Sequence, residues 1–132
     1  MKLAHVTATN SPADGFPVEI VAGRHHLCAD EPESNGGTDT GASPYGLLLS
    51  GLAACTLITL RMYAQRKEWA VTRLQVAIDM TEDDGNQHIE RRLHIDGDLD
   101  DEQRSRLLDI AERTPVTKTL KRGVEITTRL AT

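Results

Sequence analysis

Aromatic side chains are scarce in this chain. They make up 3% of its 132 residues and are limited to Phe16, Tyr45, Tyr63 and Trp69. A core must therefore be built from Leu, Ile, Val and Ala, and a chain of this length can bury one modest core but not two. Residues 1–132 are accordingly predicted to form a single domain.

Concentrated positive charge is also missing. The formal net charge is −5 and no stretch is densely basic, which argues against a nucleic-acid partner because phosphate binding needs a basic surface. The first ten residues, MKLAHVTATN, lack the apolar segment of a signal peptide. Polar residues and breakers such as Pro44 and Ser50 interrupt the longest apolar run, so no membrane span is expected and we predict a cytoplasmic protein.

Cysteine is limited to Cys28 and Cys55, which form no CxxC pair. In a reducing compartment both are expected to be free thiols. Alternation along a strand would place His26, Cys28 and Asp30 on one face, but standard metal-ligand spacing and a fourth ligand are lacking. No metal and no cofactor are therefore predicted.

The most informative segment present is GASPYGLLLSGLAACTLITL, residues 41–60, which has no charged side chain. Ser43 followed by Pro44 is typical of a helix start, and Arg66 and Lys67 favour a helix end, so a helix is predicted from about Pro44 to about Arg66. A helix without a polar face must be surrounded by protein. We expect it to be central, packed within the chain or against its copy in a dimer.

Strand-like segments flank this helix on both sides. Alternating apolar and polar residues with turn residues between them predict strands over 3–9, 16–22, 24–30, 70–80, 89–95 and 124–130. A second helix is predicted after Asp100, where Gln103 completes a capping box, and it should end near Arg113. A short helical turn over 116–121 should stop at Gly123. The fold class is α+β, in the order βββαββα(α)β with antiparallel sheets.

Cys55 is the candidate nucleophile, because it is a lone thiol inside the apolar helix. Its helical neighbours Gly51, Leu52 and Ile58 are apolar, which disfavours a thiolate, and the helix start is too far away for the dipole to help. A reactive Cys55 therefore needs a cation from elsewhere, and Arg24 on an early strand is the candidate. The alternative is that Cys55 is a small buried hydrophobe without chemistry.

Two long stretches resemble the OsmC/Ohr family of organic-hydroperoxide reductases. They are ADEPESNGGTDTGASPYGLLLSGLAACTLITLRMYAQRKEW, residues 29–69, and IDGDLDDEQRSRLLDIAERTPVTKTL, residues 95–120. The resemblance implies a single OsmC-like domain in an intertwined homodimer, with antiparallel sheets around two central helices and active sites at the subunit interface. It also implies that Cys55, in AACT, attacks the distal peroxide oxygen and becomes a sulfenic acid.

The chain departs from the family pattern at two positions. The family's resolving cysteine belongs to a CPV motif, and here Thr114 precedes Pro115 and Val116. The family also often places a glutamate just after the SP(Y) start to orient an arginine against the thiolate, and here that position is Gly46. An external thiol would then have to reduce the sulfenic acid, unless Cys28 comes within disulfide reach, a Cα separation under about 7 Å.

Two functions therefore fit the sequence. The first is reduction of organic hydroperoxides by a homodimer, with Cys55 as nucleophile, Arg24 as activator and an external thiol or dithiol as reductant. The second is a non-catalytic OsmC-like dimer that binds a small apolar ligand or senses oxidation through Cys55. The replacements at Gly46 and Thr114 keep the second function open.

Overall fold

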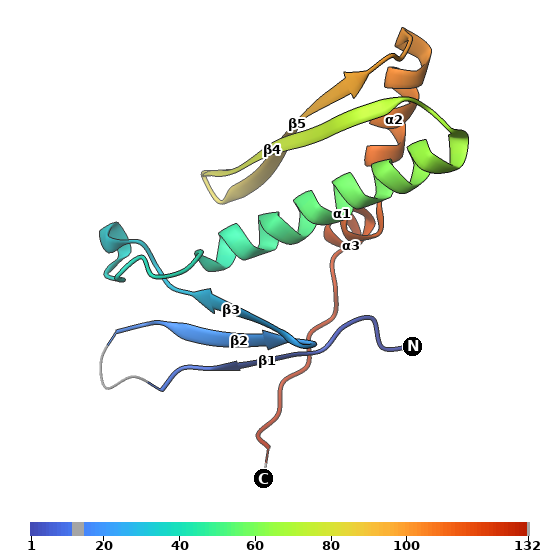
Figure 1. Ribbon diagram of the computed structural model, residues 1–132. Helices are drawn as coiled ribbons and strands as arrows, with labels where there is room; N and C mark the ends of the chain where they lie inside the picture. Colours follow the sequence, from blue (N-terminus) through green and yellow to red (C-terminus); the bar gives the residue numbers. More distant parts are fainter. Residues whose placement is uncertain (12–14, 132) are drawn as a thin grey trace. The chain divides into compact units, whose positions relative to one another are not determined.

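The computed structural model describes residues 1–11 and 15–131. The contacts of the chain divide it into two compact units, 1–50 and 51–132, and each is described by itself. The prediction of one domain for the whole chain stays a prediction. The predicted α+β class with antiparallel sheets is confirmed, and the element order along the chain is shown in Figure 1.

The first unit contains a small antiparallel sheet. Strands β1 (Val6–Thr9), β2 (Val18–Ala22) and β3 (His25–Ala29) pair in the order β1-β2-β3. Each strand is shorter than the sequence predicted, because residues 3–5 and 16–17 precede the pairing and residue 24 lies in a turn. Most side chains of the sheet are exposed on both faces: every residue of β1, and all of β3 except Ala29.

A tight loop connects β3 to the long helix. It contains the 3-10 helix η1 (Glu33–Asn35) and returns to the sheet through a parallel bridge between Ala29 and Ala42. A Cβ on Gly37 would overlap the backbone of Glu31, so the close approach of these two chain segments requires glycine there.

Helix α1 (Pro44–Lys67) begins where the sequence predicted. The backbone N–H of Gly46 donates to the Ser43 hydroxyl over 3.1 Å, and the N–H of Leu47 donates to the Ser43 carbonyl over 2.9 Å. Ser43 is therefore the N-cap, with Pro44 at the first helical position. The predicted boundaries of this helix are confirmed to within one residue.

The second unit has a long hairpin as its frame. Strands β4 (Val71–Asp83) and β5 (Asn86–Gly97) are antiparallel, from Val71 opposite Gly97 to Asp83 opposite Asn86. The turn between them is Asp84–Gly85, with φ of 52° and 81°, the backbone that favours Asp-Gly in two-residue hairpins. Helices α2 (Asp101–Ala111) and α3 (Pro115–Arg122) follow.

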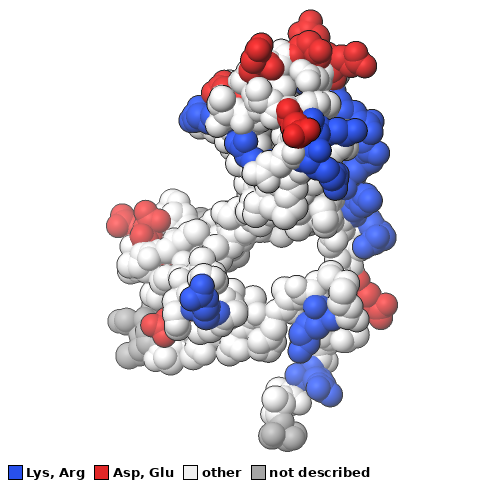
Figure 2. Space-filling view, turned by 45° about the vertical axis from the view of Figure 1, so that its right-hand side comes forward, with Lys and Arg blue, Asp and Glu red and all other residues white. Residues whose placement is uncertain are grey.

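The core of this unit lies between the hairpin, α1 and α2 (Figure 1). Its buried members come from α1, β4 and α2: Leu60, Ala64, Val71, Leu107 and Ala111. The predicted capping box of α2 is confirmed, because Asp100 and Gln103 each accept from the other's backbone N–H, at 2.7 and 2.9 Å. Figure 2 shows acidic and basic side chains close together at the top of the view. The connection from β5 to α2 is acidic, with Asp98, Asp100 and Asp101.

One prediction about this unit needs correction. Residues 124–131 form no strand, although Val124, Ile126 and Leu130 alternate with polar residues and are 66%, 84% and 93% exposed. A strand requires a neighbouring strand to pair with, and residues 124–131 have none among the described residues of this unit.

Helix α1 is only partly buried within one chain, and the prediction that a dimer copy surrounds the rest of it stays a prediction. Its buried residues are Leu52, Thr56, Leu60 and Ala64, a single stripe of spacing four, whereas Ile58 and Met62 are 55% and 63% exposed. By length and composition α1 is apolar enough to cross a membrane, a test that core helices of soluble proteins also pass. Its packing against the hairpin and α2 is that of a core helix.

Candidate functional site

Cys55 lies in the middle of α1, beside the buried stripe rather than in it. Its side chain is partly exposed, and its Sγ lies 4.0 Å from the Thr59 hydroxyl one turn further on. The next residue, Thr56, is fully buried against the core and donates to the Leu52 carbonyl over 2.7 Å. The thiol is therefore fixed at the border between the packed face of α1 and its exposed apolar face.

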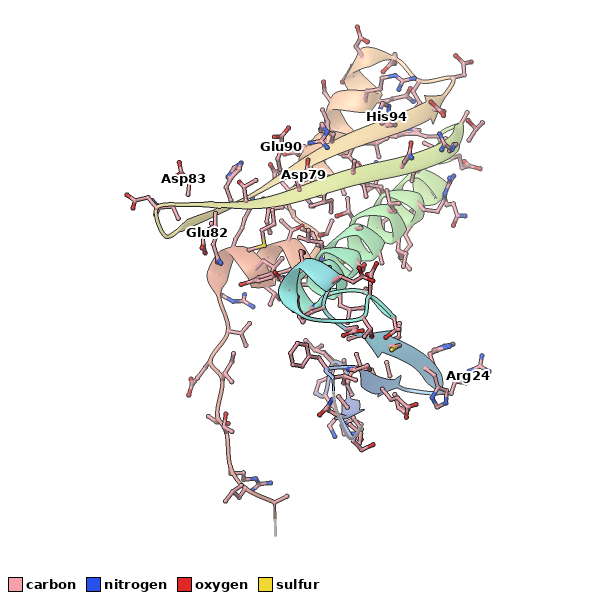
Figure 3. The ribbon with its side chains drawn as sticks, turned by 90° about the vertical axis from the view of Figure 1, so that its left-hand side faces the viewer. Arg24, Asp79, Glu82, Asp83, Glu90 and His94 are labelled. Carbon is pink, nitrogen blue, oxygen red and sulfur yellow. The ribbon has the colours of Figure 1, made fainter. Side chains whose placement is uncertain are left out.

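Arg24 does not occupy the strand position that the sequence predicted. It lies with Gly23 in the exposed turn between β2 and β3, and Figure 3 shows its side chain at that tip of the sheet. The turn is explained by Gly23, whose φ of 61° suits a tight hairpin connection. Arg24 belongs to the first unit and Cys55 to the second, so a contact between them stays a prediction.

Cys28 is the second free thiol. It lies on β3 opposite Glu19 of β2, is exposed, and its Sγ lies 3.8 Å from the Ala29 carbonyl oxygen. Because Cys28 is in the first unit, its role as a replacement resolving cysteine also stays a prediction.

Asp30 has a structural task that the sequence analysis missed. Its carboxylate is buried and accepts from the hydroxyls of Thr38 and Thr40, at 2.7 and 2.8 Å, and from three backbone N–H groups of the loop that follows. Chiefly through the Thr38 hydroxyl bond, these donors hold the pKa of the Asp30 carboxyl well below its usual range. Asp30 is therefore the anchor that folds residues 31–42 onto the sheet.

Thr114, at the position of the family's resolving cysteine, is the N-cap of α3. It is fully buried, and its hydroxyl accepts from the backbone N–H of Thr117 and lies 2.6 Å from the Thr117 hydroxyl. Threonine is a good N-cap residue, and Pro115 follows at the first helical position. This position now carries a hydrogen-bonded hydroxyl where the family pattern has a thiol.

The Thr114 hydroxyl belongs to a buried polar cluster centred on Arg91. One guanidinium nitrogen of Arg91 donates to Thr56 and to Thr117, both over 2.9 Å, and the other lies 3.3 Å from the Glu112 carboxylate. Arg91 thereby joins β5 to α1, to α3 and to the end of α2. A sequence signal existed: alternation along β5 puts position 91 on the apolar face, between Ile89 and Leu93.

An open pocket of about 580 Å³ lies at the C-terminal end of α1, lined in part by Tyr63, Trp69 and Arg106. The two rings meet edge to face, 5.5 Å between centroids. Arg106 donates to the Tyr63 hydroxyl over 3.1 Å and thereby lowers the pKa of that phenol. The lining also contains the carboxylates of Asp100 and Asp109. Positive and negative side chains are therefore mixed in this pocket, and it favours neither anions nor cations.

Comparison with known proteins gives a consistent result. The family model described as OsmC-like protein matches residues 37–129. An OsmC-like protein from Mycoplasma pneumoniae is 22% identical with a TM-score of 0.78, over 91% of this chain and 88% of that one. The organic hydroperoxide resistance protein OhrB of Bacillus subtilis is 25% identical with a TM-score of 0.62, over 91% of both chains.

A third solved structure is an organic hydroperoxide resistance protein OsmC from Legionella pneumophila, 20% identical with a TM-score of 0.66 over 92% of each chain. Among proteins with curated descriptions, none matches this chain. The similarity to the solved structures covers both units, and the family match begins in the loop before α1 and extends past α3. This chain therefore belongs to the OsmC-like protein family.

Proposed function

We propose that this protein reduces organic hydroperoxides, with the Cys55 thiol as the nucleophile and an external thiol as the reductant. The observation that carries the proposal is a partly exposed thiol midway along the apolar helix of an OsmC-like fold. It is supported by the similarity to two proteins named for organic hydroperoxide resistance. These likenesses favour a redox role for the chain.

In the first half-reaction, the Cys55 thiolate attacks the distal oxygen of the hydroperoxide. A sulfur–oxygen bond forms while the oxygen–oxygen bond breaks, and the alkoxide leaves as an alcohol after taking one proton. The sulfur is oxidised by two electrons to a sulfenic acid, and the peroxide is reduced by two.

In the second half-reaction, an external thiol attacks the sulfenic sulfur, releases water and forms a mixed disulfide with Cys55. A second thiol, or the other sulfur of a dithiol, then breaks this disulfide and restores Cys55. The external thiol must attack the sulfenic acid itself because the buried Thr114 hydroxyl cannot form a disulfide with Cys55.

The substrate class follows from the surface beside Cys55. Ile58 and Met62, one and two turns further along α1, are largely exposed apolar side chains. They line a groove of about 400 Å³ together with Leu57, Leu74 and one charged residue, Arg61. Such a surface favours a hydroperoxide with a hydrocarbon body over hydrogen peroxide.

We assign the activating cation to Arg24, an exposed residue in the turn between β2 and β3. The glutamate that would orient an arginine in the family is replaced by Gly46, where a side chain would come within 3.1 Å of the Ser43 hydroxyl. The first half-reaction should therefore be slow compared with that of relatives that keep the glutamate.

A homodimer is part of the proposal. One chain leaves much of the apolar surface of α1 exposed, together with a strand-like C-terminal segment that has no partner strand among the described residues of its unit. Both features are what an interface between two copies would cover. Removal of residues 124–132 should convert the dimer to a monomer in light scattering. A truncated protein that still has the mass of a dimer would contradict this role for the segment.

The central experiment follows consumption of cumene hydroperoxide by the wild type, Cys55→Ser and Cys28→Ser with dithiothreitol as reductant. We expect Cys55→Ser to lose consumption and Cys28→Ser to keep it, with a sulfenic acid adduct found on Cys55 alone. Hydrogen peroxide, at equal concentration, should be consumed more slowly than cumene hydroperoxide. Consumption that survives in Cys55→Ser would overturn the proposal.

A wild type that forms the Cys55 sulfenic acid but does not turn over would favour the second function, an OsmC-like dimer that senses oxidation. The observation behind that alternative is the loss of both family groups, since Gly46 and Thr114 supply neither a glutamate nor a thiol. Arg24→Gln tests the activator: it should slow sulfenic acid formation, whereas the exposed Arg113→Gln should not.

A further inference from the structure

Arg91 is a charged residue on the largely apolar face of β5. It faces Ile78 across the hairpin and follows Ile89 on the same face, and its side chain is only 13% exposed. A buried charge costs free energy unless it is paired and hydrogen-bonded. Among the described residues its one charged partner is Glu112, which is 60% exposed and 3.3 Å away, so this ion pair compensates the burial only in part.

The guanidinium also retains hydrogen-bonding capacity. Arginine has five N–H groups, and among the described residues three of those on Arg91 have acceptors, in Thr56, Thr117 and Glu112. Two N–H groups of a poorly hydrated cation therefore remain for another acceptor.

A cavity adjoins this guanidinium. It measures about 100 Å³ and has three apolar walls, one each from α1, β5 and α3, with polar and charged groups on the remaining sides. The residues that line it are Leu52, Ile89, Arg91, Thr117, Leu120 and Lys121. One water occupies about 30 Å³ in the liquid, so the cavity has room for several non-hydrogen atoms but not for a long chain.

The charge around the cavity is not balanced. Lys121 and Arg91 are both cationic, and the Glu112 carboxylate lies between them, 3.1 Å from the Lys121 ammonium and 3.3 Å from Arg91. Two cations and one carboxylate leave one positive charge. A single additional carboxylate would neutralise it, and the apolar walls would take a short hydrocarbon body rather than a strongly hydrated inorganic anion.

We propose that this cavity is a binding site for a short-chain organic carboxylate, with Arg91 and Lys121 as its cationic groups and Leu52, Ile89 and Leu120 as the apolar walls. Glu112 competes for the same two cations and therefore weakens the site. Cys55 takes no part in it, so the site does not depend on the proposed peroxide chemistry.

The test uses sodium butyrate as the probe in an NMR titration of the full chain labelled with ¹⁵N. We expect saturable shifts in the amides around Ile89, Thr117 and Lys121. Butyramide has the same shape without the charge and should bind about tenfold more weakly, the effect of losing one charge-assisted hydrogen bond. Inorganic phosphate should also bind more weakly than butyrate.

Two exposed positions supply variants that should fold normally. Glu112→Gln removes the competing carboxylate and should tighten butyrate binding about threefold, and Lys121→Met should weaken it by a similar factor, as expected for partly exposed charges. Glu102→Gln, an exposed carboxylate on α2 outside the cavity lining, is the matched control and should leave the affinity unchanged.

Butyrate shifts that do not saturate, equal binding of butyramide, tighter binding of phosphate, or an affinity unmoved by both Glu112→Gln and Lys121→Met would each overturn the proposal. Cys55→Ser should bind butyrate like the wild type. A protein that binds butyrate but consumes no peroxide would therefore refute the proposed function and leave this site intact. A protein that consumes peroxide but does not bind butyrate would refute the site and leave the proposed function intact.

Discussion

The two units of this chain use their side chains in different ways. In residues 51–132, the hairpin, α1 and α2 share a core that contains the fully buried Leu60 and Leu107. In the described part of residues 1–50 most side chains of the sheet are exposed, and the buried residues are Ala29 and Asp30. The second unit is held by apolar packing, whereas the first is organised around one carboxylate and its hydrogen bonds.

This difference separates two kinds of stabilisation within one chain. Apolar burial gives the second unit a core whose packing involves no titrating group. The hydrogen bonds of Asp30 depend on its charge and so on pH. Substitutions that act on one kind of stabilisation and not the other should therefore separate the two units experimentally.

The largest effect is expected from the core of the second unit. Leu107→Ala removes a side chain that is fully buried, and the resulting cavity should lower the free energy of unfolding by about 2–5 kcal/mol. Leu108→Ala, the next residue on α2 and 53% exposed, is the matched control and should cost far less. Urea unfolding measures both. Equal losses would contradict the assignment of Leu107 to the core.

A smaller loss is expected at Thr114. Thr114→Ala removes a buried N-cap and leaves the Thr117 hydroxyl without its 2.6 Å partner, so unfolding should become easier by about 1–2 kcal/mol. Thr114→Ser keeps the cap and should recover most of the loss. The measurement is again urea unfolding, and a serine variant as unstable as the alanine variant would contradict the capping role.

Acid should act on the first unit through Asp30. The folded-state pKa of this carboxyl is lowered, so its stabilising contribution is complete above the unfolded-state pKa of about 3.9 and is lost as pH falls toward the lower folded-state value. Hydrogen exchange of the Thr38 and Thr40 amides should accelerate, relative to intrinsic rates, below about pH 4.

Asp30→Asn should accelerate the same two amides at neutral pH and remove the acid dependence, because the variant has no proton to gain. Amides of the core, such as that of Leu107, serve as the internal reference and should not respond. Protection in the loop that stays unchanged in Asp30→Asn would contradict the anchoring role of this carboxylate.

The smallest effect is expected on the outer face of the hairpin. Asp79 and Glu90 are directly opposed on β4 and β5, and Figure 3 shows them side by side, away from α1. Arg92 reaches both, at 2.8 and 3.4 Å. Arg92→Gln would leave two like charges opposed, so a slight destabilisation is expected that disappears in high salt. A loss that is insensitive to salt would contradict this electrostatic explanation.

Local signals in the sequence were sufficient for most of the fold. The start of α1 follows from Ser43 and Pro44, the hairpin turn from Asp84 and Gly85, and the start of α2 from Asp100. These features depend on a few neighbouring residues, whose capping and turn chemistry operates within each segment. For that reason their positions could be predicted closely.

The features that the sequence did not predict depend on contacts between distant segments. The 124–131 segment alternates like a strand, but only a neighbouring strand could make it one. Arg91 contacts Thr56, 35 positions earlier in the chain, and Thr117, 26 positions later. Arg24 was expected on a strand because the turn was predicted at Gly23 alone, whereas it also includes Arg24. For Cys55, local pattern identifies the thiol but not the cation that would ionise it.

The hydroxyl at position 114 has a consequence for how long a reactive Cys55 would survive. A nearby thiol would capture a sulfenic acid within the molecule before a second oxidant arrived, and the Thr114 hydroxyl cannot do so. Every turnover would therefore leave the sulfur open to sulfinic acid formation, which is irreversible for most proteins. A burst of peroxide that outpaces the external reductant would permanently inactivate the protein. The number of turnovers per molecule would then depend on the peroxide concentration.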